Sequence, residues 1–418
     1  MGTFHRLFAV LRDRKGNAML IAAFAMPVLV GAGGLATDTI QWTLWKRQLQ
    51  RQADSAALAG AYALAQGANV NNSATAEINR YNLVTLTGSP VIQNAPTTGD
   101  FAGDTSAVRV VLSTSQTLPF SSFFLSSPPV ITAEATARVV AGGTYCMWAR
   151  EPTAVVGITM KGNATVNMGC GMFTNSKASN AVNAGGSSQI TATPVAAVGG
   201  LQSSSNYVSP TTLQPYSIPQ PDPFANLPEP TVPTPCANLK VQPNDASSTI
   251  APGCYSTMNI NGPVVLQAGV YFINGGSFSA GAQAIITQLN TASLKGVTII
   301  LTGNNANNIA TINMNGSAQV QLTASETGAF AGVLFYQDRR APDSGTNLIN
   351  GNANSTLQGA IYMPNQEVEF SGNSGMNTNC LQIASRRITF TGNNNISNVC
   401  PPGSGTRTFT GTRVRLVG

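Results

Sequence analysis

The chain has 418 residues, of which 43% are hydrophobic and only 9% are charged, with a formal net charge of +6. A chain of this length predicts two or three domains, and its ordinary apolar fraction argues against a charge-rich disordered protein. Its basic residues form no groove with interleaved aromatic side chains, which argues against nucleic-acid binding. Low charge with abundant Gly, Asn, Ser and Thr is typical of an extracytoplasmic, β-rich protein.

Residues 1–17 form a basic N-terminus, and residues 18–36 form an uncharged apolar stretch. This stretch is long enough to cross a bilayer as a helix, and Pro27 is tolerated better there than in a soluble helix. The positive-inside rule places the N-terminus in the cytoplasm and the chain from residue 38 onward outside. A cleaved signal peptide ending near Ala36 is the alternative. We favour a permanent anchor, because the apolar run is long and the helix-forming sequence continues beyond it.

A second helix is predicted over residues 37–68, directly after the span. Small residues recur along it every four positions, which lets another helix approach closely. The alternative is a solvated stalk, but Asp54 interrupts an otherwise smooth apolar face. We therefore predict packing against partner helices through Ala53, Asp54, Ala57, Gly60, Ala61 and Ala65. Asp38 follows the span, where a carboxylate can return to water at the membrane surface.

Three segments of this region carry a family resemblance: Gly16-Asn17-Ala18, Ala36-Thr37-Asp38 and the run Leu49–Ala61. In this order they resemble the N-terminal part of TadG-like proteins of the bacterial Tad (Flp) pilus-assembly system. The resemblance implies an inner-membrane protein with its bulk in the periplasm, pilus-assembly machinery as partners, and allows a homo-oligomer through the Ala-rich helix.

Two positions depart from patterns found in this system. Pseudopilins carry a Glu where this chain has Ile21, so processing by a prepilin peptidase is not expected. Some relatives carry an Asp-x-Ser-x-Ser metal motif, and its nearest match, Asp104–Val108, lacks the final Ser. We therefore carry over no metal site.

A small α+β connector is predicted over residues 69–141. A helix over 74–83 is followed by two alternating segments, 107–113 and 131–140, that are typical of half-buried strands. Between them lies the Phe-rich segment 118–125, which is either a partner surface or the apolar plug of the small sheet. We expect core packing, since aromatic clusters usually mark it.

Residues 142–403 are predicted to form a right-handed parallel β-helix-like domain, so that the whole chain is mainly β. Gly-Asn pairs start at 351, 372 and 392, between short apolar runs. A period near twenty with tight turns points to stacked coils, with Asn side chains forming ladders. An antiparallel β-sandwich is the alternative. The Pro-rich segment 208–235 is predicted to be an extended loop strapped over this domain, and residues 404–418 a tail or last strand.

Six cysteines lie after the span, and the only histidine, His5, lies before it. No Cys-x-x-Cys spacing indicates zinc, so disulfides in an oxidising compartment are the economical interpretation. Neighbours in sequence suggest the pairs Cys146–Cys170, Cys236–Cys254 and Cys380–Cys400, among fifteen connectivities.

An enzyme is not expected, and neither catalytic residues, cofactors nor metals are predicted. The carboxylates of most interest are Glu367 and Glu369, on one strand face, and the turn Asp338-Arg339-Arg340 with Asp343. A solvated strand face and a charged turn explain them better than a glycosidase pair. The sequence therefore predicts a non-enzymatic scaffold or binding module of pilus assembly. The competing hypothesis is a secreted or surface carbohydrate-binding or carbohydrate-degrading β-helix with a cleaved leader.

Overall fold

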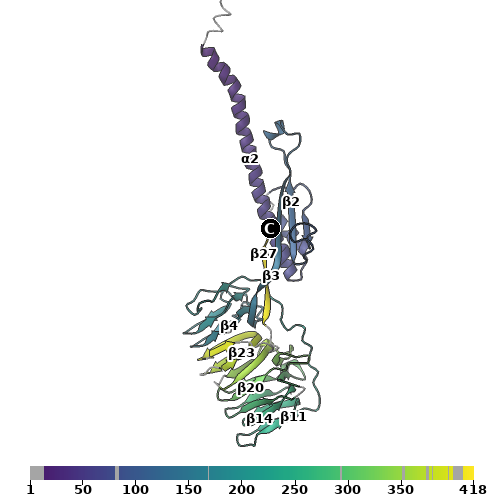
Figure 1. Ribbon diagram of the computed structural model, residues 1–418, viewed down its shortest axis with the longest axis vertical. Helices are drawn as coiled ribbons and strands as arrows, with labels where there is room; N and C mark the ends of the chain where they lie inside the picture. The colour runs from purple at the N-terminus through teal and green to yellow at the C-terminus, as the bar shows by residue number, and fades with distance from the viewer. Residues whose placement is uncertain are drawn as a thin grey trace, which may run out of the picture. The chain divides into compact units, whose positions relative to one another are not determined.

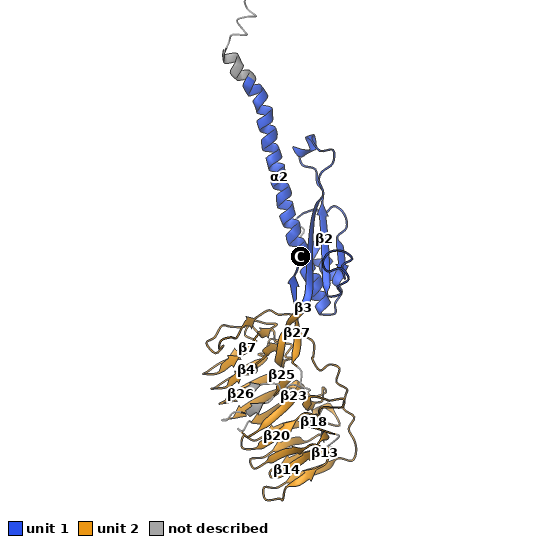
Figure 2. Cartoon of the chain, viewed as in Figure 1, with its two compact units in different colours: residues 1–140, 413–418 blue, residues 141–412 orange. Residues whose placement is uncertain are grey.

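The computed structural model describes residues 14–80, 84–167, 169–291, 294–350, 354–372, 376–378, 380–393, 395–398 and 408–418. It divides into two compact units (Figure 2). Unit 1 comprises residues 1–140 and 413–418, and unit 2 comprises residues 141–412. The predicted connector, residues 69–141, lies in unit 1 up to residue 140, together with the preceding long helix and the last six residues.

Unit 1 is built on one continuous helix, α2 (Arg14–Ala65), which contains both the apolar span and the Ala-rich segment (Figure 1). Among the described residues, α2 is the one helix long and apolar enough to cross a membrane. Pro27 lies inside it. After a turn at Gly67, whose φ is +67°, the Asn69 side chain accepts a hydrogen bond from the Asn72 N–H and so caps a second helix, α3 (Val70–Arg80).

An antiparallel sheet packs against these helices. Its strands are β1 (Val91–Asn94), β2 (Ala107–Thr114) and β3 (Ile131–Ala149), and the β2–β3 connection holds a 3-10 helix, η1 (Ser121–Phe123). β2 pairs with β1 on one side and with β3 on the other. Alternate residues of β2 face the core, because strand side chains alternate between faces. The predicted strands 107–113 and 131–140 are confirmed, and residues 81–83 of the predicted helix 74–83 lie outside the described residues.

Unit 2 is a parallel β-helix, which confirms the favoured fold class over the antiparallel sandwich. Its strands form three parallel ladders, because each coil contributes a strand to each face. The first ladder contains β13 (Gly253–Ile260), β15 (Gly269–Asn274), β18 (Val297–Thr302), β21 (Val333–Gln337), β23 (Thr356–Gly372), β25 (Leu381–Gly392), β3, β6 (Gly171–Thr174), β9 (Val195–Ala197) and β10 (Leu213–Gln214).

The other two ladders repeat this arrangement. The second contains β11 (Ala237–Val241), β13, β16 (Ser277–Ala280), β19 (Thr311–Met314), β22 (Thr346–Asn350), β23, β25, β4 (Ile158–Met160) and β7 (Val182–Ala184). The third contains β12 (Ser248–Ile250), β14 (Pro263–Gln267), β17 (Ile285–Leu289), β20 (Gln319–Thr323), β23, β24 (Met376–Thr378), β26 (Asn395–Asn398), β5 (Thr165–Asn167) and β8 (Gln189–Thr191). A short 3-10 helix, η2 (Ala306–Asn308), lies in one loop, and β27 (Phe409–Leu416) ends the chain.

The coils do not stack in sequence order. The last large strand, β25, pairs with β3 and β4, which begin the unit: Ile383 lies opposite Met147, and Ile388 opposite Ile158. From this pairing, which we call the seam, the early coils continue through β6 to β9, while the later coils continue through β23 to β11. The two free ends of the stack therefore come from the middle of the sequence.

The strand residues that precede the predicted Gly-Asn turns lie opposite one another in successive coils, whereas Gly351, Asn352 and Asn373 themselves lie outside the described residues. Ile349 pairs with Phe370, and Phe370 with Phe390, which reproduces the predicted period near twenty. Across the seam, Asn163 Nδ2 donates to Asn393 Oδ1 over 2.9 Å, a rung of the predicted Asn ladder. A Cβ on Gly392, whose φ is +82°, would lie 2.5 Å from a backbone oxygen of the next coil, so the corner requires glycine.

The Pro-rich segment joins the two ends of the stack. It leaves β10 at one end and enters β11 at the other, and contacts the coils between as it passes. Gln220 exchanges backbone hydrogen bonds with the Asn175 side chain, at 2.9 Å each. The Arg339 guanidinium, further along the stack, donates to the carbonyl oxygens of Phe224 and Leu227. The prediction of a loop strapped over the β-helix is confirmed.

Two predicted disulfides are present, Cys146–Cys170 and Cys236–Cys254. The second one ties the end of the Pro-rich segment to β13. Cys380 is also disulfide-bonded, and Cys400, its predicted partner, lies outside the described residues.

Candidate functional site

The small-residue face of α2 is the core of unit 1. Ala53, Ala57 and Ala61 are fully buried, and they belong to one cluster with residues of α3 and β2. A Cβ on Gly60 would lie 2.8 Å from Val108 of β2, so only glycine allows the sheet to come this close. The helix that the small residues admit is α3 of the same chain. The interpretation of this face as a docking surface for partner helices is therefore corrected.

Asp54 and Ala65 are only half-buried, at the margins of this core. Asp54 Oδ1 accepts a hydrogen bond from Gln50 Nε2 over 2.9 Å, and the same amide group donates to the carbonyl oxygen of Glu134 in β3 over 2.7 Å. Asp54 thus helps to hold α2 on its own sheet. The signal that could have revealed this was the second small row, because Ala56 and Gly60 widen the apolar face beyond what one helix partner needs.

Asp38 is also used inside the chain. Its side chain is only 4% exposed, and its carboxylate accepts a hydrogen bond of 2.6 Å from the backbone N–H of Ser121, the first residue of η1. The expectation that this carboxylate returns to water is therefore wrong. The Phe-rich segment was also misread as core, since Phe123 is 84% exposed and Phe124 69% exposed.

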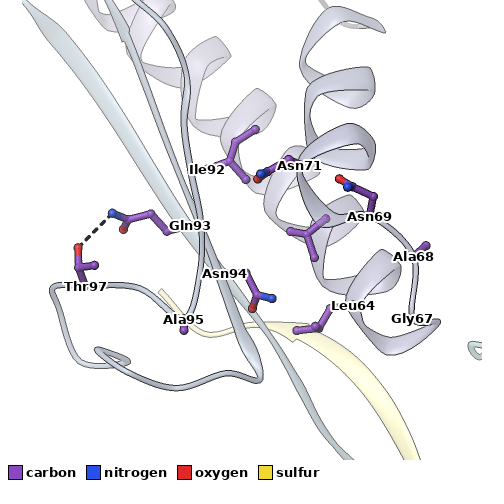
Figure 3. Close-up of a pocket in the computed structure, with 11 residues that line it drawn as sticks. Leu64, Gly67, Ala68, Asn69, Asn71, Ile92, Gln93, Asn94, Ala95 and Thr97 are labelled. Atoms are coloured by element: carbon purple, nitrogen blue, oxygen red, sulfur yellow. Dashed lines mark hydrogen bonds between the residues drawn. The ribbon is translucent and has the colours of Figure 1, made fainter.

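A groove of about 630 Å³ lies in unit 1 between the α2–α3 turn and β1 (Figure 3). Its walls carry side-chain amides and apolar groups but no titratable side chain. Gln93 is already engaged, because its Nε2 donates to Thr97 Oγ1 over 3.1 Å and its Oε1 accepts from Arg109. β1 pairs with β2 alone among the described strands, so its outer edge offers backbone groups for strand addition.

The carboxylates considered for catalysis in unit 2 are all engaged with neighbouring side chains. Glu367 and Glu369 face outward on β23 as predicted, where they accept from Thr389 over 2.5 Å and Thr391 over 3.2 Å. Asp338 is buried and pairs with Arg340 over 2.7 Å. Burial raises the pKa of Asp338, but hydrogen bonds from Arg340 and Thr302 outweigh burial and hold it below its ordinary value. Asp338 is thus a member of a structural ion pair, and Glu367 and Glu369 are hydrogen-bonded to the neighbouring strand.

An ionic network that sequence analysis missed crosses the seam. Glu151, which follows β3, is fully buried and lies 3.0 Å from Arg386 Nε and 2.8 Å from Arg387 Nη1 of β25. The outer sides of both arginines pair with Asp343. Burial disfavours the ionised form of Glu151, but hydrogen bonds from Thr153 and Arg387 outweigh it and lower its pKa. Adjacent arginines in a chain so poor in charge were the available signal.

A second cavity, of about 650 Å³, lies in unit 2 beneath the Pro-rich segment. It is lined by aromatic, proline and polar side chains: Trp148, Pro221, Pro223, Phe224, Leu227, Glu326, Gln382, Phe409 and neighbouring small residues. Trp148 and Gln382 are each 2% exposed, and neither Trp148 Nε1 nor Gln382 Nε2 has a hydrogen-bond partner among the described residues. Two buried donors without acceptors are costly in a dry site, so this cavity suits an occupant with oxygen atoms.

The Tad family model, which describes TadE/G-like proteins of Flp pilus assembly, matches residues 16–63. The matched segment is almost the whole of α2, including the apolar span and the small-residue face. No curated protein and no solved structure matches the chain. A pilus-assembly segment and one helix suited to crossing a membrane fit a membrane-anchored assembly component. The match over residues 16–63 confirms the resemblance to TadE/G-like proteins of Flp pilus assembly that the sequence indicated.

Proposed function

We propose that this protein is an inner-membrane-anchored component of Tad/Flp pilus assembly whose β-helix serves as a non-enzymatic periplasmic scaffold. The observation that carries the proposal is the continuity of α2. One helix runs from the apolar span into the buried core of unit 1, so the family segment is both anchor and structural core. Because the helix is continuous, a movement of the span in the membrane would also move unit 1.

Deletion of the gene in its own bacterium tests the role in assembly. We expect loss of Tad pili by electron microscopy and their return when the full chain is supplied. A chain with residues 18–36 replaced by an unrelated apolar helix of equal length is the matched control. Its rescue would limit the span to anchoring, and its failure would assign the span to specific contacts. Normal piliation of the deletion strain would overturn the proposal.

The periplasmic placement of unit 2 rests on two observations. The N-terminus carries four basic residues before the span, and unit 2 holds disulfides, which persist in oxidising compartments. Protease added to spheroplasts should cleave within residues 208–235, whereas intact cells should protect them. Cleavage only in inverted membrane vesicles would place unit 2 in the cytoplasm and contradict the proposal.

The non-enzymatic role is supported by the pairing of the candidate carboxylates. Glu367→Gln with Glu369→Gln should leave piliation unchanged, because these side chains bond neighbouring groups on the outer strand face, Thr389 and Arg387 for Glu367 and Thr391 for Glu369. A polysaccharide-degrading activity of the purified full chain that this double variant abolishes would refute the scaffold role and favour the carbohydrate-active alternative.

The cavity beneath the Pro-rich segment favours a second function, binding of a sugar. Aromatic rings pack against the apolar faces of sugars, and the two free donors, Trp148 Nε1 and Gln382 Nε2, match hydroxyl or ring oxygens. A glycan array probed with the full chain tests this function. Trp148→Phe, which keeps a ring but removes the N–H, should weaken any glycan bound several-fold. Equal binding by the variant, or no binding by either protein, would remove this function.

A further inference from the structure

The β2–β3 hairpin of unit 1 climbs along α2 toward the apolar span (Figure 1). Four contacts within unit 1 trace this path. The Glu134 carbonyl accepts from Gln50 and the Thr132 carbonyl from Lys46. Further along, the Ser121 N–H donates to Asp38, and the Phe120 ring lies against Gly34. From Gln50 to Gly34, the hairpin follows α2 for about 24 Å at the helical rise.

The hairpin is fixed at its upper end by close contacts. A Cβ added to Gly34 would lie 2.1 Å from the Phe120 ring, so the ring sits directly on the helix backbone. One turn below, the buried carboxylate of Asp38 caps the first turn of η1. Gly34 belongs to the apolar span, and Asp38 is the first charged residue after it. The hairpin tip is therefore held at the level where α2 passes from apolar to polar sequence.

The tip of the hairpin is apolar and exposed to solvent. Phe123 is 84% exposed, Phe124 69% and Val130 68%, and residues 115–130 contain no Asp, Glu, Lys or Arg. Isolated exposed apolar residues are ordinary, but three large ones on an uncharged loop form a patch that water covers at a cost. The apolar span of α2 is itself exposed above this contact, and Val28 is 69% exposed.

We propose that this hairpin tip is a second membrane contact, in which Phe123 and Phe124 insert into the interfacial region of the bilayer beside α2. The occupant of the patch is lipid, because the contacts of Phe120 with Gly34 and of Ser121 with Asp38 hold the tip at the end of the span that lipid covers when α2 crosses the membrane. Aromatic and aliphatic side chains are the residues that interfacial segments place at the boundary of headgroups and acyl chains. This inference rests on the proposed anchoring by α2.

The contact has a consequence for orientation. A single spanning helix can rotate about its axis and tilt, and these angles are set by packing and by interfacial anchors. A hairpin that touches the bilayer on one side of α2 fixes the rotation of unit 1 about the helix. The hydrogen bond from the Ser121 N–H to the buried Asp38 carboxylate joins the hairpin to α2 at the membrane surface, and it is therefore central to this arrangement.

Spin labels on the full chain in phospholipid vesicles test the insertion. None of the described cysteines is free, so a single new cysteine can be labelled at Phe123→Cys, with Val28→Cys as the reference inside the span and Val91→Cys, 46% exposed on β1, as the aqueous reference. Collisions with oxygen and with a water-soluble nickel chelate report depth. We expect the oxygen-to-nickel ratio at position 123 to lie between those at positions 28 and 91, because the interface is shallower than the middle of the span, and to exceed that at position 91 several-fold.

Other results would overturn the inference in distinguishable ways. An aqueous ratio at position 123 with a lipid-like ratio at position 28 would refute the hairpin contact and leave the anchor intact. Aqueous ratios at both positions would refute the anchor itself. Low accessibility to both reagents at position 123, with spin–spin broadening, would show that a second copy of the chain covers the patch instead of lipid. All three labelled positions are exposed, so none requires a change in the core.

Discussion

Replacing Glu151 with Gln should open the seam of the β-helix. Glu151 is fully buried and is the inner partner of Arg386 and Arg387, which join β25 to the residues after β3. Removing one member of a buried ion pair costs about 3–5 kcal/mol. Asp343 still neutralises the outer sides of both arginines, whose side chains are 20–23% exposed. We therefore expect a loss of about 2–4 kcal/mol.

A single tryptophan at the seam can report this loss. The chain has three tryptophans, and Trp42→Phe with Trp45→Phe leaves only Trp148, which lies opposite Ala384 of β25. Urea unfolding of the full chain in detergent, followed by Trp148 fluorescence, should have a lower midpoint for Glu151→Gln. Glu369→Gln, which loses one bond to Thr391, is the matched control and should change little. A Glu151→Gln midpoint within error of the control would refute the reasoning.

Three further predictions follow from buried groups. Because the pKa of Glu151 is lowered from 4.5, the ionised Glu151 stabilises the folded state fully above that pH, and this contribution is lost as the pH falls through the folded-state pKa. Acid unfolding should therefore depend less steeply on pH in Glu151→Gln, and identical acid transitions would contradict this. Gly60→Val should lower the free energy of unfolding by about 1–3 kcal/mol, because the added side chain would overpack the contact with Val108. Thermal unfolding followed by circular dichroism should therefore show a lower melting temperature than for the half-buried control Ala59→Val, and equal melting temperatures would exclude close packing at Gly60. Cys236→Ser with Cys254→Ser should lose about 3 kcal/mol of loop-closure stabilisation and speed proteolysis of the Pro-rich segment. Unchanged proteolysis would show that this segment stays bound to the coils without the disulfide.

Local patterns predicted much of the fold. The spacing of Gly-Asn pairs near twenty predicted the β-helix because each corner requires the same turn geometry, and the structure places Phe370 directly opposite Phe390. The two disulfides were predicted from closeness in sequence, and both join neighbouring coils. The order of the coils could not be predicted. The contact of Asn163 with Asn393 joins residues 230 apart, and identical corners are compatible with any stacking order.

The candidate site was predicted less well, for a related reason. The small residues of α2 correctly indicated close helix packing, but nothing in their spacing distinguishes a partner helix from α3 of the same chain. The Phe-rich segment was assigned to the core by composition alone. Its exposure depends on the contacts of Phe120 with Gly34 and of Ser121 with Asp38, which link segments far apart in the sequence. Pairings between distant segments are the information that a single sequence lacks.

The seam also imposes an order on folding. In a β-helix stacked in sequence order, each coil finds its neighbour already formed, so contacts stay local and closure entropy is small. Here β3 and β4 are among the first strands of unit 2, yet their partner β25 lies more than two hundred residues later. Until β25 arrives, their edges have unsatisfied backbone groups that other chains can pair with. In a protein that is synthesised from its N-terminus, the edges of β3 and β4 therefore stay unpaired until β25 has been made. The stack of coils is complete only when β25 pairs with them.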